Sequence, residues 1–120
     1  MSLPTRKPKD RHPYLQDPES KLCTSATEPG DYAYVQDAGG TLWVVPNGPH
    51  QHPKVLGGAK PAAAAGELVV GEKQQVVEVN SLSGTFQIGP ESLVGVVTAL
   101  RSVGLEVPED AIKRYPKNFF

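Results

Sequence analysis

Two histidines separated by one residue are the first side chains in this sequence that could carry out chemistry. His50 and His52 flank Gln51, and in an extended segment residues two apart point to the same side. Histidine is the side chain most easily poised for proton transfer near neutral pH. We therefore take both imidazoles as candidates for one catalytic site. A solvated loop beside prolines would hold the same residues without a function.

Glu67 is the carboxylate that could complete such a site. It follows four alanines and Gly66 and then enters an apolar run. Metal-independent cleavage of RNA needs an acid, a base and donors that stabilise the phosphate. His52, Glu67 and one of the cations Lys54 and Lys60 could supply these groups. The alternative is a charge at a strand edge that faces water.

Two other reactions could use the same region. His50, His52 and Glu67 are residue types that bind zinc, but nothing fixes a third ligand or a diagnostic spacing, so we expect no metal site and no resident cofactor. An ADP-ribosyltransferase acting on NAD would use an acidic residue to stabilise an oxocarbenium-like centre, with Ser83 and Thr85 positioning the nicotinamide. The tripeptide Ser83-Gly84-Thr85 is also typical of a turn or β-bulge.

Composition narrows the possible partners. Lys and Arg total 12 and Asp and Glu total 13, giving a net charge of -1, so no general basic field attracts nucleic acid or a membrane. An RNA substrate would have to be recognised locally, with Trp43 as a candidate stacking or packing residue. The single cysteine, Cys23, excludes an intramolecular disulfide. No apolar run approaches the roughly 20 residues of a transmembrane helix, and no cleavable signal opens the chain.

The first 30 residues read as a flexible, proline-rich N-terminal arm. They contain five prolines and no sustained apolar periodicity, so they bury too little surface to offset their ordering entropy. The alternative is that Tyr14, Leu15 and Leu22 attach the arm to the body. We expect residues 31–120 to form a single α+β domain.

Short apolar runs separated by turn residues predict a small antiparallel sheet of about five strands. The expected strands cover 32–35, 41–45, 67–70, 75–79 and 85–88, and a glycine-containing turn at 37–40 predicts a hairpin between the first two. Residues 50–60 are expected to be loop or edge, because prolines and glycines interrupt them. The alanine run at 62–65 favours either a short helix or the close approach of another element.

One main C-terminal helix is the clearest predicted element. Pro90 suits its first turn and Gly104 its C-cap. Between them an apolar stripe recurs at helical spacing, made of Leu93, Val96, Val97, Leu100 and Val103. A short second helix is predicted to open near Val107. Strands followed by helices favour an α+β fold with the helices on one face of the sheet.

The order of these signals also resembles a known module. A hairpin with Leu42-Trp43-Val44 leads to His52-Pro53-Lys54-Val55-Leu56-Gly57-Gly58, then Ala63-Ala64-Ala65-Gly66-Glu67-Leu68, Ser83-Gly84-Thr85-Phe86 and a helix. This order resembles a C-terminal module of bacterial polymorphic toxins and effectors, and it is similar to a segment of the plant calmodulin-binding IQM proteins. The resemblance covers about two-thirds of the chain.

The resemblance implies a toxin or effector domain with a cognate immunity or partner protein. Such domains are delivered by a secretion system or within a larger exported protein, and act in the cytoplasm of the recipient cell. The alternative is a non-catalytic interaction module, such as an immunity or adaptor protein. The sequence departs from the family pattern at Pro53 and Lys54, and at Thr85 and Phe86, where the wider pattern has a histidine and an aromatic hydroxyl. The second departure puts the reaction of other members in doubt here.

Overall fold

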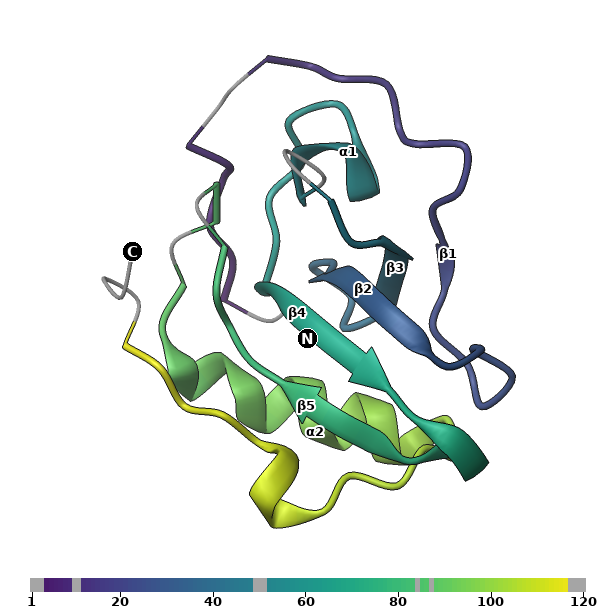
Figure 1. Ribbon diagram of the computed structural model, residues 1–120. Helices are drawn as coiled ribbons and strands as arrows, with labels where there is room; N and C mark the ends of the chain where they lie inside the picture. Colours follow the sequence, from purple (N-terminus) through teal and green to yellow (C-terminus); the bar gives the residue numbers. More distant parts are fainter. Residues whose placement is uncertain (1–3, 10–11, 49–51, 84, 87, 117–120) are drawn as a thin grey trace.

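The computed structural model describes residues 4–9, 12–48, 52–83, 85–86 and 88–116. Its centre is a five-stranded sheet made of β1 (Lys21–Leu22), β2 (Gly30–Gln36), β3 (Leu42–Pro46), β4 (Ala64–Val70) and β5 (Val76–Val79). The strand order is β1-β3-β2-β4-β5, and every neighbouring pair is antiparallel. Together with the helix α2 (Leu93–Ser102), this sheet confirms the predicted α+β class (Figure 1).

The predicted hairpin joins β2 and β3 through Asp37. The Oδ1 atom of Asp37 accepts the backbone N–H groups of Gly39 and Thr41 at 2.9 and 3.0 Å. Gly40 takes a φ of +93°, which glycine adopts without steric cost. The turn therefore fixes a register in which Gln36 lies opposite Leu42.

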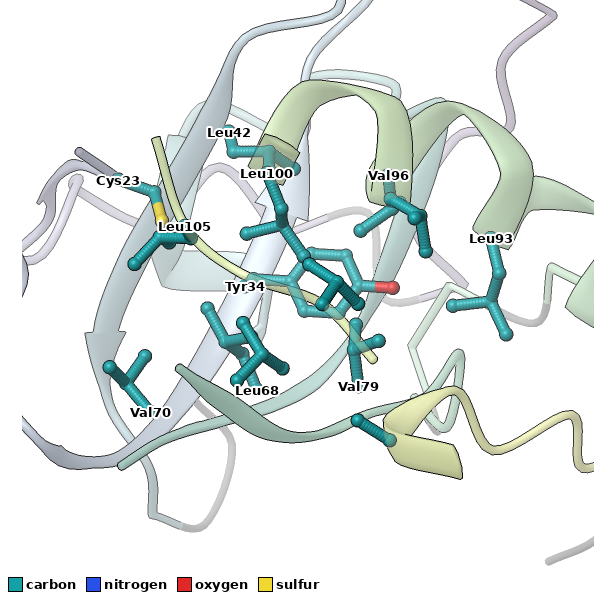
Figure 2. Close-up of a cluster of buried hydrophobic side chains, with 14 of the residues drawn as sticks. Cys23, Tyr34, Leu42, Leu68, Val70, Val79, Leu93, Val96, Leu100 and Leu105 are labelled. Atoms are coloured by element: carbon teal, nitrogen blue, oxygen red, sulfur yellow. The ribbon is translucent and has the colours of Figure 1, made fainter. Parts of the chain in front are cut away.

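One face of the sheet packs against α2. Successive strand residues point to opposite faces, so Tyr34 and Leu68 share this face with the helix residues Leu93, Val96 and Leu100. Figure 2 shows the Tyr34 ring in the middle of this cluster. Of the predicted apolar stripe, Leu93, Val96, Val97 and Leu100 are buried, while Val103 is 37% exposed at the helix end. Gly104 follows with a φ of +100°, as a C-cap requires.

The opposite face carries a short helix, α1 (His52–Leu56), inside the segment that was expected to be loop or edge. Val55 of α1 is fully buried in a second apolar cluster with Val35, Ala65 and Phe86. A five-residue helix is not stable by propensity alone, so tertiary packing rather than local sequence forms it. The helices therefore cover both faces, and the expectation of helices on one face does not hold (Figure 1).

Part of the segment expected to form a free arm lies along the body. Arg6 forms a backbone bridge with Ala62, and β1 pairs with β3. Cys23, only 4% exposed, belongs to the α2 core. Of the three residues proposed to attach the arm, Tyr14 contacts the body, because its carbonyl oxygen accepts the N–H of Gly58 at 2.8 Å. The side chains of Leu15 and Leu22 are 91% and 49% exposed and do not anchor it.

The C-terminal elements differ in detail from the prediction. Thr85 and Phe86 form a bend rather than the predicted strand, although Phe86 is buried. Single turns of 3-10 helix occur at η1 (Glu72–Gln74), η2 (Pro90–Ser92) and η3 (Glu109–Ala111), and η3 stands where the second helix was predicted. Among the described residues, no helix is both long and apolar enough to span a bilayer.

Candidate functional site

His52 begins α1 and points its ring at the neighbouring strand. Its Nε2 atom lies 2.8 Å from the backbone carbonyl oxygen of Gly66 in β4. A carbonyl oxygen only accepts, so Nε2 carries the proton and Nδ1 is the basic nitrogen of the neutral ring. Burial lowers the pKa of His52 below its ordinary value, while the bond to Gly66 and the negative charge of Glu67 oppose that change. The imidazole is therefore neutral at pH 7 and chemically a base.

Glu67 follows Gly66 directly and lies on the α1 face of the sheet. Its two carboxylate oxygens accept hydrogen bonds from two amide groups, that of Asn47 at 3.2 Å and that of Asn80 at 3.1 Å. The side chain is half-buried. His52 bonds the backbone carbonyl of Gly66, the residue before Glu67, and the charge of Glu67 acts on the imidazole, so the two groups of the sequence hypothesis lie near each other.

Asn80 organises this cluster and was not identified from the sequence. It is fully buried at the end of β5. Its Oδ1 atom accepts the backbone N–H groups of Glu67 and Leu82, each at 3.0 Å. Its Nδ2 atom donates to both Glu67 and Glu78, so the two carboxylates lie on either side of one amide. The only sequence signal was an asparagine opening a turn, which usually indicates local backbone capping.

The predicted nicotinamide-positioning residues, Ser83 and Thr85, both make contacts within the fold. Ser83 is 3% exposed, and its Oγ atom accepts the backbone N–H of Phe86 at 3.1 Å. Thr85 accepts the backbone N–H of Lys9 at 2.8 Å through its own carbonyl oxygen. The Ser83 contact is typical of a turn, and the Thr85 contact attaches the N-terminal segment.

The predicted substrate-binding residues fall into two places on the α1 side. Lys54 of α1 places its ammonium group 5.7 Å from the centre of the Tyr14 ring, a cation–π contact. Trp43 and Lys60 line a separate pocket of about 440 Å³ with Gln16, Asp37 and Leu56. The indole nitrogen of Trp43 donates to Asp37 at 3.1 Å, which fixes the ring at the pocket wall.

His50 lies outside the described residues, so its predicted partnership with His52 stays a prediction. In the part of the chain that the structure describes, no three His, Cys, Asp or Glu side chains gather as a metal-binding group requires.

The fold and the site therefore define a small α+β domain. In it a buried asparagine joins two carboxylates, and one of these directly follows the glycine that His52 contacts. Comparison of the chain with protein families, curated proteins and solved structures gives no match.

Proposed function

We propose that this protein is a bacterial toxin or effector domain that cleaves RNA without a metal ion. The observation that carries the proposal is the hydrogen bond from His52 Nε2 to the carbonyl of Gly66, beside the carboxylate of Glu67. It holds a neutral imidazole, whose Nδ1 atom is the basic nitrogen, near a negative charge. A base oriented by hydrogen bonds and supported by a carboxylate is the arrangement that proton transfer requires.

The proposed reaction is an internal transphosphorylation. Nδ1 of His52 takes the proton of a ribose 2′-hydroxyl, the 2′ oxygen attacks the adjacent phosphorus, and the bond from phosphorus to the 5′ oxygen breaks. The imidazolium then returns its proton to the departing 5′ oxygen, which leaves a 2′,3′-cyclic phosphate and a free 5′-hydroxyl. Glu67 and the Gly66 carbonyl stabilise the imidazolium between these steps, in keeping with the direction in which each moves the pKa of His52.

RNA is favoured over NAD by two features of the surroundings. Ser83, which would position a nicotinamide, is buried and accepts the N–H of Phe86. The pocket with Trp43 and Lys60 instead offers an aromatic face and a cation on the α1 side, the combination that holds a base and a phosphate of a single strand.

The test combines growth and cleavage assays. The domain is expressed from an inducible promoter in a bacterium, and the purified protein is incubated with a fluorophore-labelled RNA in the presence of EDTA. We expect growth arrest and cleavage to a 2′,3′-cyclic phosphate. His52→Gln keeps an N–H donor for Gly66 but removes the basic nitrogen, so the rate should fall about 100-fold or more.

Glu67→Gln is the matched isosteric change, and Thr98→Ala on the outer side of α2 serves as the control. Glu67→Gln should slow cleavage about tenfold or more by removing the charge that supports the imidazolium, whereas Thr98→Ala should leave the rate unchanged. A wild-type protein that is harmless when soluble, and that leaves RNA intact at high enzyme concentration, would refute the proposal.

A second candidate is a non-catalytic interaction module. The observation in its favour is Val94 of α2, which is 76% exposed. It lines a groove of about 210 Å³ between α2 and η3, together with Arg101, Glu109 and Arg114. The test is co-purification with the product of the neighbouring gene. Capture that survives His52→Gln and is lost in Val94→Asp would favour this function, and capture insensitive to Val94→Asp would argue against it.

A further inference from the structure

A separate cavity lies at the end of the sheet where β2 finishes and β4 begins. Its volume is about 340 Å³, which is in the range of small-molecule sites. The N-terminal segment forms one wall and the first turns of η2 and α2 form the other. The polar residues that carry the argument are Arg6, Gln36 and Glu91, and the apolar ones are Ala63 and Ile88.

Gln36 is the polar group on the floor of this cavity. Its side chain is 3% exposed, and its Nε2 atom donates to the carbonyl oxygens of Gly40 and Gly95 at 3.0 and 3.4 Å. Two carbonyl acceptors fix which end of the amide is the nitrogen. The Oε1 atom then has no hydrogen-bond partner among the described residues. Because Gln36 lines the cavity, this oxygen is an acceptor that a ligand N–H group can reach.

The rim of the cavity carries one positive and one negative side chain. Arg6 and Glu91 are both exposed and both line the opening. The carboxylate of Glu91 folds over Gly89, because a Cβ atom at position 89 would lie only 2.2 Å from Glu91 Oε2. Glycine at this position therefore allows the carboxylate to occupy its place at the rim.

We infer that this cavity binds the guanine base of a free nucleoside. The site offers two acceptors, Gln36 Oε1 and the Glu91 carboxylate, and one cationic donor, Arg6. Guanine carries neighbouring N–H donors and, on another edge, the O6 and N7 acceptors that arginine recognises. Ala63 and Ile88 provide the apolar floor for the ring. A simple anion is disfavoured, because the carboxylate of Glu91 would repel it.

This inference does not rest on the proposed cleavage of RNA. Gln36 follows Tyr34 by two residues and so faces the α2 side of the sheet, whereas Glu67 faces the α1 side. Its test is a binding measurement that needs no catalytic activity, so either proposal can fail while the other stands.

The first experiment is calorimetric titration of the whole protein with guanosine, inosine, adenosine and cytidine. We expect saturable binding of guanosine. Inosine lacks the 2-amino donor, so it should bind about two- to tenfold more weakly. Adenosine and cytidine present a different order of donors and acceptors and should bind more weakly still. Absence of saturable guanosine binding at millimolar concentration, or equal affinity for all four nucleosides, would overturn the inference.

Gly95→Ala is the sharpest variant, because the chain should tolerate it. The added methyl would lie 3.6 Å from Gln36 Oε1, an ordinary van der Waals distance, and alanine is the better helix former. It would stand in front of the acceptor, so guanosine affinity should fall about tenfold or more. Thr98→Ala alters an exposed residue of the same helix outside this cavity and should leave the affinity unchanged.

Gly89→Ala provides an independent second variant. The new methyl would displace the flexible carboxylate of Glu91 without removing it, and the backbone at position 89, with a φ of -74°, accepts alanine. The preference for guanosine over inosine should shrink toward equality. Guanosine affinity unchanged in both Gly95→Ala and Gly89→Ala would show that the nucleoside binds elsewhere and would contradict the inference.

Discussion

Gly66 and Asn80 approach each other more closely than any side chain at position 66 would allow. A Cβ atom built on Gly66 would lie 1.9 Å from the backbone carbonyl oxygen of Asn80 and 2.7 Å from its carbonyl carbon. The sequence had left open whether the small residues before Glu67 form a helix or admit another element, and the structure shows the second. This close approach holds the end of β5 against β4 and so places Asn80 beside Glu67.

Gly66→Ala should therefore disrupt the fold. The clash is with backbone atoms, which cannot rotate away, so the loss should be about 3 kcal/mol or more in the free energy of unfolding. Chemical denaturation followed by circular dichroism measures it. Gly39→Ala is the control, since its new Cβ would meet only Asp37 Oδ1 at 3.4 Å. Equal stability of the two variants would mean that the strands are not so close.

The neutral state of His52 predicts a loss of stability in mild acid. Its pKa is lowered in the folded protein, so the unfolded chain binds more protons between that pKa and the ordinary value of about 6.5. The free energy of unfolding should fall as the pH drops below about 6.5 and level off, for this group, below the folded pKa. Each unit of pKa depression corresponds to about 1.4 kcal/mol.

Denaturation curves of the wild type and His52→Gln between pH 7.5 and about 5 provide the measurement. Glutamine does not titrate, so the variant should show a flatter profile across this window. The same slope in both proteins would assign the acid effect to other groups.

The hydroxyl of Tyr34 should stabilise the core through a single hydrogen bond. It donates to the carbonyl oxygen of Asn80 at 2.7 Å from a side chain that is 1% exposed, and burial raises its pKa well above the ordinary tyrosine value. Tyr34→Phe would leave that carbonyl without this donor, at a cost of about 1–3 kcal/mol. Tyr32→Phe removes a bond of the same length to the carbonyl of the exposed Glu28. Tyr32→Phe should lower the free energy of unfolding less than Tyr34→Phe does. A larger loss for Tyr32→Phe would contradict the stabilising role of the Tyr34 hydroxyl.

Cys23 should react slowly with thiol reagents in the folded protein. It is 4% exposed, and burial raises the pKa of its thiol, an effect that the Thr27 hydroxyl at 3.9 Å only partly offsets. Reaction therefore needs local opening of the N-terminal segment, and labelling by a disulfide reagent should be at least about 100-fold slower than in denaturant. Comparable rates in the two conditions would indicate that this segment leaves the body freely, as a flexible arm would.

The sequence predicted best those elements whose formation depends on interactions between residues close together in the chain. The helix from Leu93 followed from its apolar spacing, and Gly104 marked its end, because helix periodicity and capping are local properties. The hairpin at Asp37 followed for the same reason. The expected strand at 85–88 does not form in the described residues. Phe86 instead lies in a bend, from which its side chain packs into the core.

By itself the sequence determined the α+β class, the main helix, most of the strands and the candidate pair His52 and Glu67. Only the tertiary structure decided that α1 forms, that its first residue meets Gly66, and that Asn80 joins two carboxylates. These outcomes depend on contacts between residues far apart in the chain, here 14 positions between His52 and Gly66. Such contacts are selected by the packing of the whole sheet, and no local pattern encodes them.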